Sequence, residues 1–261
     1  MMIRRIGLVV AGLGAGAWLL YKSQVRTMVV SAKAELPERG FSHAHFAAVL
    51  ARFVDDEGRV DYEELRAQRG DLEAYLAQLA KASPEATPSR FETRDAKLAY
   101  YLNAYNAFML YQITERPGLK SVNDMPIRVF GLTKFDMGGR QVTLHALENE
   151  FIRPMGEPRI HFALNCASLG CPTLARAPFE ADALEAQLAV ATRAFCRDSR
   201  HVRREGNVVH LSQIFRWYAE DFGPSGGPLV FCRSWGRDDI PEGAEVRYLP
   251  YDWGLNAKLK G

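Results

Sequence analysis

Apolar residues recur at helical spacing through the first half of the chain. Residues 43–54 carry them every three or four positions, which predicts an amphipathic helix. Asp61, with Glu64 three residues later, predicts a capping box that opens a second helical stretch, broken near Gly70. Residues 95–114 are apolar around most of the helical circumference. Such a segment is typical of a central, buried helix.

The apolar spacing shortens after residue 120. Strands are expected at residues 127–130, 134–137, 141–144, 159–165 and 245–249, with a hairpin over 201–211. Helices are expected at residues 144–153, 179–196, 212–222 and 229–235. Helices first and short hairpin strands later predict an α+β fold in a single domain. Its helical N-terminal half would pack on a mostly antiparallel sheet from the C-terminal half.

The first 34 residues follow a different pattern. Arg4 and Arg5 precede an uncharged run over residues 6–21. This run is short of the roughly 20 residues of a spanning helix, yet long for the apolar part of a secretory signal. We interpret residues 1–34 as an export signal, cleaved or retained as an inner-membrane anchor through residues 6–21. Residues 35–261 would then form one periplasmic or otherwise extracytoplasmic domain.

A dinucleotide-binding motif is the competing interpretation of this segment. Residues 12–17 fit G-x-G-x-x-A, and Glu35 follows at about the distance of a ribose-binding acid. However, the rest of the chain lacks the alternating strands and helices of that fold. Small residues are also common in apolar export segments. We therefore expect no cofactor.

Composition narrows the class of protein without giving an activity. The chain has 261 residues, of which 48% are hydrophobic and 25% are charged, enough for one sizeable core. Its 33 basic and 31 acidic side chains leave no excess to neutralise a phosphate backbone, which argues against a nucleic-acid partner. Four cysteines are too few for a scaffold built on disulfides.

Five segments resemble a known family. They are Tyr101–Ala107, Leu144–Glu148, Arg159–Pro172, Leu211–Tyr218 and Tyr251–Asn256. Together, and in this order, they are similar to the hallmark segments of the domain of unknown function 547 family, although a leucine replaces the isoleucine of its L-x-x-I-E element. The resemblance implies little chemistry because the family has no assigned function. It agrees with the export segment, since bacterial members are often secreted or membrane-anchored.

His161 and Cys166 are the pair that could carry nucleophilic chemistry. An imidazole close to a thiol lowers the thiol pKa and so raises the population of the reactive thiolate. Residues five apart on a regular strand point to opposite faces, so the pair meets only if the strand ends near Asn165. Glu148 or Asp252 would orient the imidazole, and Asn103 or Asn165 would donate to an oxyanion. The candidate catalytic residues, expected to meet in one pocket, are Asn103, Glu148, His161, Asn165, Cys166 and Asp252.

Non-catalytic explanations of the same residues remain open. Cys166 and Cys171 could form a structural disulfide in a membrane-anchored binding or scaffold domain. Asn103 and Asn106 would then be core amides. A metal site at His161 and the two cysteines lacks a fourth ligand at a recognisable spacing, so we expect no metal. The partner would be an unknown small molecule or peptide, plus the membrane if the N-terminal segment is retained. Whether the protein is an enzyme stays open. The aromatic residues that belong either to the core or to a ligand groove are Phe215, Trp217, Tyr218, Trp235 and Trp253.

Overall fold

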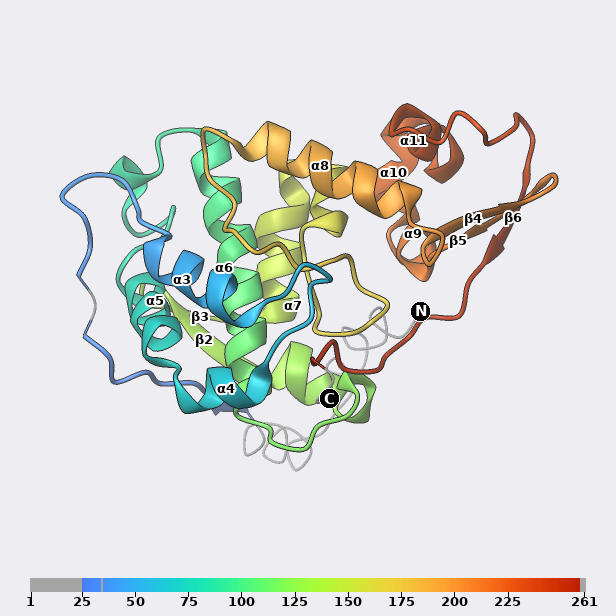
Figure 1. Ribbon diagram of the computed structural model, residues 1–261. Coiled ribbons are helices and arrows are strands. Elements are labelled where there is room, and N and C mark those ends of the chain that lie inside the picture. Colours follow the sequence, from blue (N-terminus) through green and yellow to red (C-terminus); the bar gives the residue numbers. More distant parts are fainter. Residues whose placement is uncertain (1–24, 34, 259–261) are drawn as a thin grey trace, which may run out of the picture.

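A long helix, α6 (Arg94–Thr114), runs through the middle of the molecule (Figure 1). In this computed structural model, which describes residues 25–33 and 35–258, every α6 residue from Leu98 to Thr114 is buried. The Thr93 hydroxyl caps the helix by accepting a hydrogen bond from the Ala96 amide at 3.0 Å. The predicted central helix is confirmed.

Three further helices pack around α6 in the N-terminal half. They are α3 (Ala44–Phe53), α4 (Tyr62–Ala67) and α5 (Gly70–Lys81). Asp61 caps α4 by accepting from the Glu64 amide at 3.0 Å, whereas the Glu64 carboxylate accepts from Gln68 instead of reaching back. The expected capping box is therefore half formed, and the expected break near Gly70 is confirmed.

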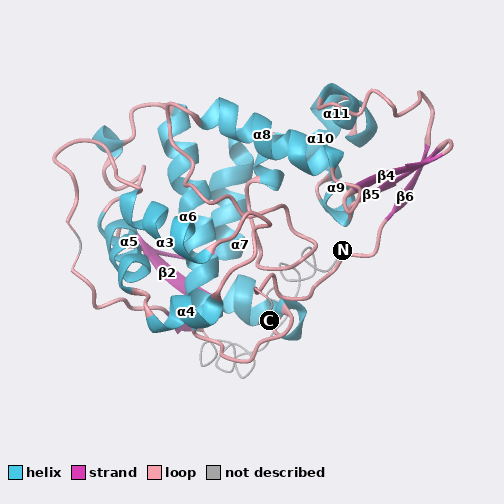
Figure 2. Ribbon diagram, viewed as in Figure 1, coloured by secondary structure: helices cyan, strands magenta, loops and turns pink. Residues whose placement is uncertain are grey.

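Two small sheets of three strands each lie apart from one another (Figure 2). The first pairs β1 (Arg26–Thr27) in parallel with β2 (Thr133–Met137), which forms an antiparallel hairpin with β3 (Arg140–Thr143). Phe135 on β2 faces α6 and stacks on Phe108, with ring centroids 4.3 Å apart. This sheet is thereby tied to the main core.

The second sheet belongs to a separate group of elements, on the right in Figure 1. Here β4 (Val202–Glu205) and β5 (Val208–Leu211) form the predicted hairpin, and β6 (Glu245–Tyr248) pairs in parallel with β5. A second apolar cluster lies beside it and includes Phe162, Phe195 and Phe215. The helices of this region are α9 (Gln213–Trp217), α10 (Ala219–Phe222) and α11 (Pro228–Ser234). Helix α8 (Leu184–Arg197) joins the two parts, because Leu184 and Leu188 belong to the main core and Phe195 belongs to the second cluster.

The α+β class is confirmed, but two details of the expected fold are wrong. Each sheet is mixed, so there is no single, mostly antiparallel sheet among the described residues, and β1 comes from residues before the expected domain. Residues expected to be strands are helical at Arg128–Leu132, a π-helix, and at Pro158–Phe162, a 3-10 helix. Segments of about five residues are too short to show a period that separates a strand from a helical turn, and Pro158 favours the helical start.

Two expectations fall on residues outside the ranges that the structure describes. The apolar run over residues 6–21 and the glycine pattern at residues 12–17 both fall there. Within residues 25–33 and 35–258, no helix combines the length and the apolar character needed to span a membrane.

Candidate disulfide site and its buried carboxylate network

Two asparagines on α6 hold both ends of the loop that carries the cysteines. The Asn106 side chain donates to the Ala163 carbonyl at 3.0 Å and accepts from the Asn165 amide at 2.9 Å. One turn earlier, Asn103 donates to the Phe179 carbonyl at 2.8 Å and accepts from the Phe179 amide at 2.9 Å. Both asparagine side chains are buried and hydrogen-bonded, so they act as core amides that fix the backbone of the loop.

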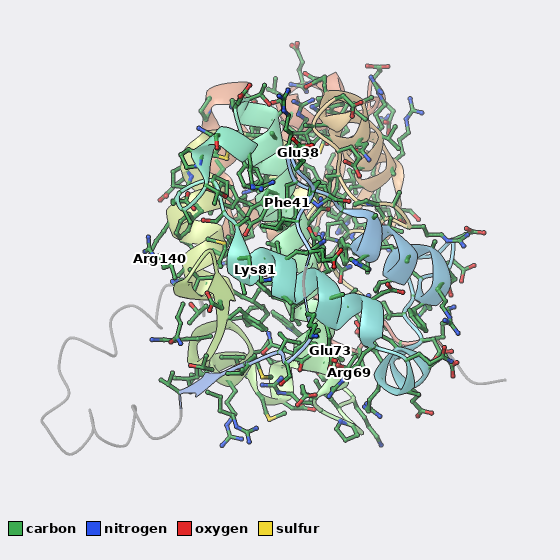
Figure 3. All side chains as sticks on the ribbon, turned by 90° about the vertical axis from the view of Figure 1, so that its left-hand side faces the viewer. Glu38, Phe41, Arg69, Glu73, Lys81 and Arg140 are labelled. Carbon is green, nitrogen blue, oxygen red and sulfur yellow. A yellow bond between two sulfur atoms is a disulfide. The ribbon has the colours of Figure 1, made fainter. Side chains whose placement is uncertain are left out.

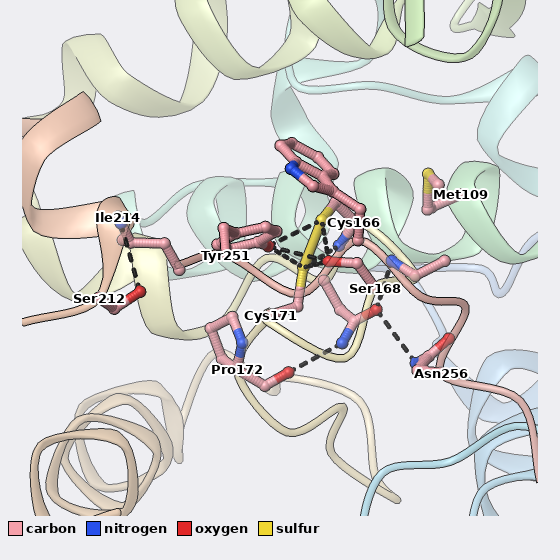
Figure 4. The surroundings of a disulfide bond; sticks show 12 residues. Met109, Cys166, Ser168, Cys171, Pro172, Ser212, Ile214, Tyr251 and Asn256 are labelled. Carbon is pink, nitrogen blue, oxygen red and sulfur yellow. Dashed lines mark hydrogen bonds between the residues drawn. A yellow bond between two sulfur atoms is a disulfide. The ribbon is translucent and has the colours of Figure 1, made fainter. Parts of the chain in front are cut away.

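Within this loop, Cys166 and Cys171 form a disulfide (Figure 4). The Asn165 side chain supports the loop from inside, because it accepts from the Ala167 amide at 2.8 Å and donates to the Pro172 carbonyl at 2.8 Å. Three of the predicted residues, Asn103, Asn165 and Cys166, thus belong to one loop and its supports. The Cys166 sulfur is bonded rather than free.

Two hydroxyl groups contact the disulfide. The Tyr251 hydroxyl lies 3.3 Å from the Cys166 sulfur and 3.1 Å from the Cys171 sulfur (Figure 4). It also lies 2.9 Å from the Ser168 hydroxyl, which is 3.1 Å from the Cys166 sulfur. Burial raises the pKa of Tyr251, and the hydrogen bond with Ser168 only partly opposes this shift. Tyr251 therefore stays protonated and able to donate a hydrogen bond at neutral pH.

The C-terminal segment crosses this loop and brings Tyr251 to it. The Gly170 amide donates to the Asp252 carbonyl at 2.8 Å, and a Cβ at Gly170 would lie 2.9 Å from that same oxygen. Only glycine permits this approach without a shift of the backbone. The Asp252 carboxylate is exposed and accepts from the Gly254 amide at 2.9 Å. The predicted residue Asp252 thus shapes its own turn.

His161 pairs with a residue that the sequence did not point to. Its Nε2 lies 2.7 Å from the Asp221 carboxylate, which also accepts two hydrogen bonds from Arg153, both at 2.8 Å. Burial raises the pKa of Asp221, but the hydrogen bonds with His161 and Arg153 outweigh it and hold this pKa well below the usual range. The imidazole stacks on Tyr218, with centroids 3.9 Å apart, so the ring is fixed in place.

Glu148 also contacts Tyr218. It is buried, with 8% of its surface exposed, and it hydrogen-bonds the Tyr218 side chain. Burial raises the pKa of Tyr218 and of Tyr105, and the Glu148 charge raises both further. Tyr251 also adds to these two shifts, which places it within electrostatic range of the network. Glu148 and His161 thus both contact Tyr218.

The structure distributes the predicted residues over three neighbouring features: the Asn-supported disulfide loop, the Asp252 turn, and the network of His161 and Glu148. Their catalytic roles remain predictions. Sequence reasoning missed Arg153, Ser168, Asp221 and Tyr251 as partners. Ser168 and Tyr251 lie within the segments that carry the family resemblance, which was an available signal. Within residues 25–33 and 35–258, no group of three or more acidic, histidine or cysteine side chains is placed to hold a metal ion.

Comparison with known protein families tests the family resemblance that the five sequence segments carry. Residues 88–196 match the family model described as "Protein of unknown function, DUF547". Over these residues the chain is similar to the DUF547 family. The matched DUF547 region begins just before α6, contains the disulfide loop and ends in α8. No curated protein and no solved structure matches the chain.

Proposed function

We propose that this chain is a non-catalytic binding domain, held at the membrane outside the cytoplasm, with Cys166–Cys171 as a structural disulfide. The bond between these two sulfurs carries the proposal, because it occupies the thiol that a cysteine enzyme would need. The loop around it is fixed at both ends by Asn103 and Asn106. A loop held in this way is suited to support a binding surface.

The proposed location draws on the disulfide and on the sequence together. Structural disulfides persist in oxidising compartments and are rare in the cytosol. The uncharged run over residues 6–21, preceded by Arg4 and Arg5, is of the kind that directs export or anchors a chain in the inner membrane. Both features favour an extracytoplasmic domain attached through its N-terminal segment.

The proposed binding surface lies beside the disulfide. The rings of Trp217, Tyr251 and Trp253 contact one another, with centroids 4.5 to 5.6 Å apart, and all three residues are only half-buried. Grouped aromatic side chains offer a large apolar contact area. This surface would contact a small molecule or a peptide.

A second candidate function is a thiol-dependent hydrolase or an acyl or amide transferase that acts when the disulfide is reduced. It is favoured by the hydroxyls of Ser168 and Tyr251, which would donate to a Cys166 thiolate. His161 was the expected general base. Among the described residues its imidazole contacts Asp221 and Tyr218, and the hydrogen bonds of the Cys166 sulfur are with Ser168 and Tyr251, not with His161; this makes the binding domain the better-supported function.

Alkylation of the full chain separates the two candidates. In a variant carrying Cys196→Ser and Cys232→Ser, spheroplasts of a bacterial host would be treated with a membrane-impermeant maleimide, with and without prior reduction. The proposal predicts that half-exposed Cys166 is labelled only after reduction, and that adding Cys166→Ser removes that label. Labelling without reduction would favour the thiol enzyme. Labelling that appears only after the membrane is permeabilised would contradict the external location.

A further inference from the structure

Three arginines line one cavity that shares no residue with the disulfide loop. The cavity has a volume of about 530 Å³ and is lined by Arg26, Arg116 and Arg128, together with Met125 and Thr133. This volume falls within the range of roughly 300–1,000 Å³ that is typical of small-molecule sites. Figure 3 shows β1, which carries Arg26, as the pale blue strand near the lower edge of the view.

No carboxylate among the described residues forms an ion pair with the arginines of this cavity. The residues outside the description add no Asp or Glu side chain that could do so. Glu115 is the acid whose charge acts on Arg116, but its carboxylate is paired with Arg69. Arg69 also pairs with Glu73, which is labelled beside it in Figure 3. Three guanidinium groups therefore face one space without a carboxylate.

Two hydrogen bonds position Arg116 at this cavity. Its guanidinium donates to the Gln112 carbonyl and, at 3.3 Å, to the Thr133 hydroxyl, which fixes it between the end of α6 and the start of β2. Burial lowers the pKa of Arg116, the charges of Arg26 and Arg128 lower it further, and the Glu115 charge opposes this shift only in part. The repulsion between these arginines would be relieved by a bound anion.

A second arginine-lined cavity shows the contrast. It measures about 470 Å³ and lies beside the β4–β5 hairpin. Here Arg237 pairs with the Asp239 carboxylate at 2.8 Å, and Arg204 donates to the Asp239 carbonyl at 2.6 Å. Arg203 pairs with Glu205 at 3.0 Å. Two arginines of this second cavity, Arg203 and Arg237, thus pair with carboxylates, whereas none of the three in the first cavity pairs with a carboxylate among the described residues.

We propose that the cavity of Arg26, Arg116 and Arg128 binds the phosphate group of an anionic lipid headgroup or of a soluble phosphate ester. Guanidinium forks match the oxygens of a phosphate and form charge-assisted hydrogen bonds with them. The three arginines enter from different elements, so they can contact different oxygens of one tetrahedral group. The cavity leaves room for the organic part of such a ligand.

Two observations favour the lipid as the source of the phosphate. Arg26 follows the apolar run that ends at residue 21 by five residues, which span at most about 18 Å, so the cavity would lie close to the membrane surface. Val29 lies just beyond β1, which carries Arg26, and is 78% exposed. Ile127 directly precedes Arg128 and is 56% exposed. Basic groups beside exposed apolar residues suit an interface of anionic lipid. The lipid source, though not the phosphate chemistry, rests on the anchoring proposed above.

The soluble arm of the test uses glycerol 3-phosphate. The full chain in non-ionic detergent micelles would be titrated by calorimetry at constant ionic strength, with acetate as the carboxylate comparison. The double substitution Arg26→Gln and Arg128→Gln should weaken phosphate binding about a hundredfold, roughly tenfold for each guanidinium lost. Both side chains are exposed, so the variant should stay folded. The control, Arg203→Gln with Arg247→Gln, removes the same charge elsewhere and should bind as the original protein does.

The lipid arm places the full chain in nanodiscs of phosphatidylcholine, with or without phosphatidylglycerol. Hydrogen exchange of residues 26–30 and 125–134 should slow with phosphatidylglycerol in the original protein and in the control, but not in the double variant. A response in the nanodiscs alone assigns the lipid, and a response to glycerol 3-phosphate alone assigns a soluble ester. No response in either arm, equal binding of acetate, or an unaffected double variant would overturn the proposal. None of these outcomes depends on the redox state of Cys166, so the proposed function is tested separately.

Discussion

Loss of the Cys166–Cys171 bond should lower the stability of the fold by a calculable amount. The two cysteines are separated by five residues, so the bond closes a short loop. The chain-entropy relation for a loop of about six residues gives roughly 2 kcal/mol at 25 °C. The Asn165 hydrogen bonds to Ala167 and Pro172 do not involve the sulfurs and should persist, so the loss should stay near this value.

The expected change in melting temperature follows from the size of the protein. For chains of about 150–250 residues, 1 kcal/mol corresponds to about 2–4 °C, so the double substitution Cys166→Ser and Cys171→Ser should lower Tm by about 4–8 °C. Thermal unfolding would be followed by circular dichroism of the full chain in non-ionic detergent, with and without a reductant. Reductant should bring the original protein down to the Tm of the double variant, and should leave that variant unchanged.

A matched variant controls for the other pair of cysteines. Cys196 and Cys232 are buried free thiols whose sulfurs lie 4.0 Å apart. A variant with Cys196→Ala and Cys232→Ala should keep the whole response to reductant, whatever its starting Tm. If reductant leaves the Tm of the original protein unmoved, or if the response disappears with this control variant, the assignment of the stabilising bond to Cys166 and Cys171 is refuted.

Three further changes test the supports of the site. Asp221→Asn should cost about 2 kcal/mol at pH 7; since the folded-state pKa of Asp221 is depressed, this difference should shrink as the pH falls below about 4, measured by urea unfolding of both proteins. Burial lowers the pKa of His43 to about 4, so neutral His43 contributes stability that is fully present above pH 6.5. This contribution should fall by about 2 kcal/mol between pH 6.5 and 5 in the original protein and should be missing from His43→Gln. An equal pH dependence of stability in the two proteins would disprove this role of His43. Asn103→Ala leaves the buried amide and carbonyl of Phe179 without hydrogen-bond partners, so the free energy of unfolding should fall by about 2–4 kcal/mol in the same assay. An unchanged urea midpoint would contradict the supporting role of Asn103.

Local signals were enough to predict much of the fold. The apolar circumference of residues 95–114 predicted the central helix, and the cap at Asp61 predicted the start of α4. The hairpin of β4 and β5 was also predicted, because its turn and its alternation are set by neighbouring residues. The helical turn at residues 158–162 was not, since so short a segment does not show the periodicity that distinguishes a strand from a helix.

The candidate site was harder to predict than the fold. His161 and Asp221 are 60 residues apart, and Tyr251 lies 80 residues beyond Cys171. Such pairs are set by how α6, the loop and the C-terminal segment pack, and no spacing rule along one sequence encodes them. By contrast, a bond between Cys166 and Cys171 could be weighed from their five-residue separation alone, because a bond of that kind is local.

The state of one peptide tests the central claim most directly. Trypsin would release residues 160–176 as a single fragment that holds both Cys166 and Cys171. The full chain, isolated from cells under an alkylating reagent and without reductant, should yield this fragment unalkylated and lighter than the dithiol form by two hydrogen atoms. A fragment alkylated at Cys166 before any reduction would contradict the structural disulfide, and with it the binding domain built on that bond.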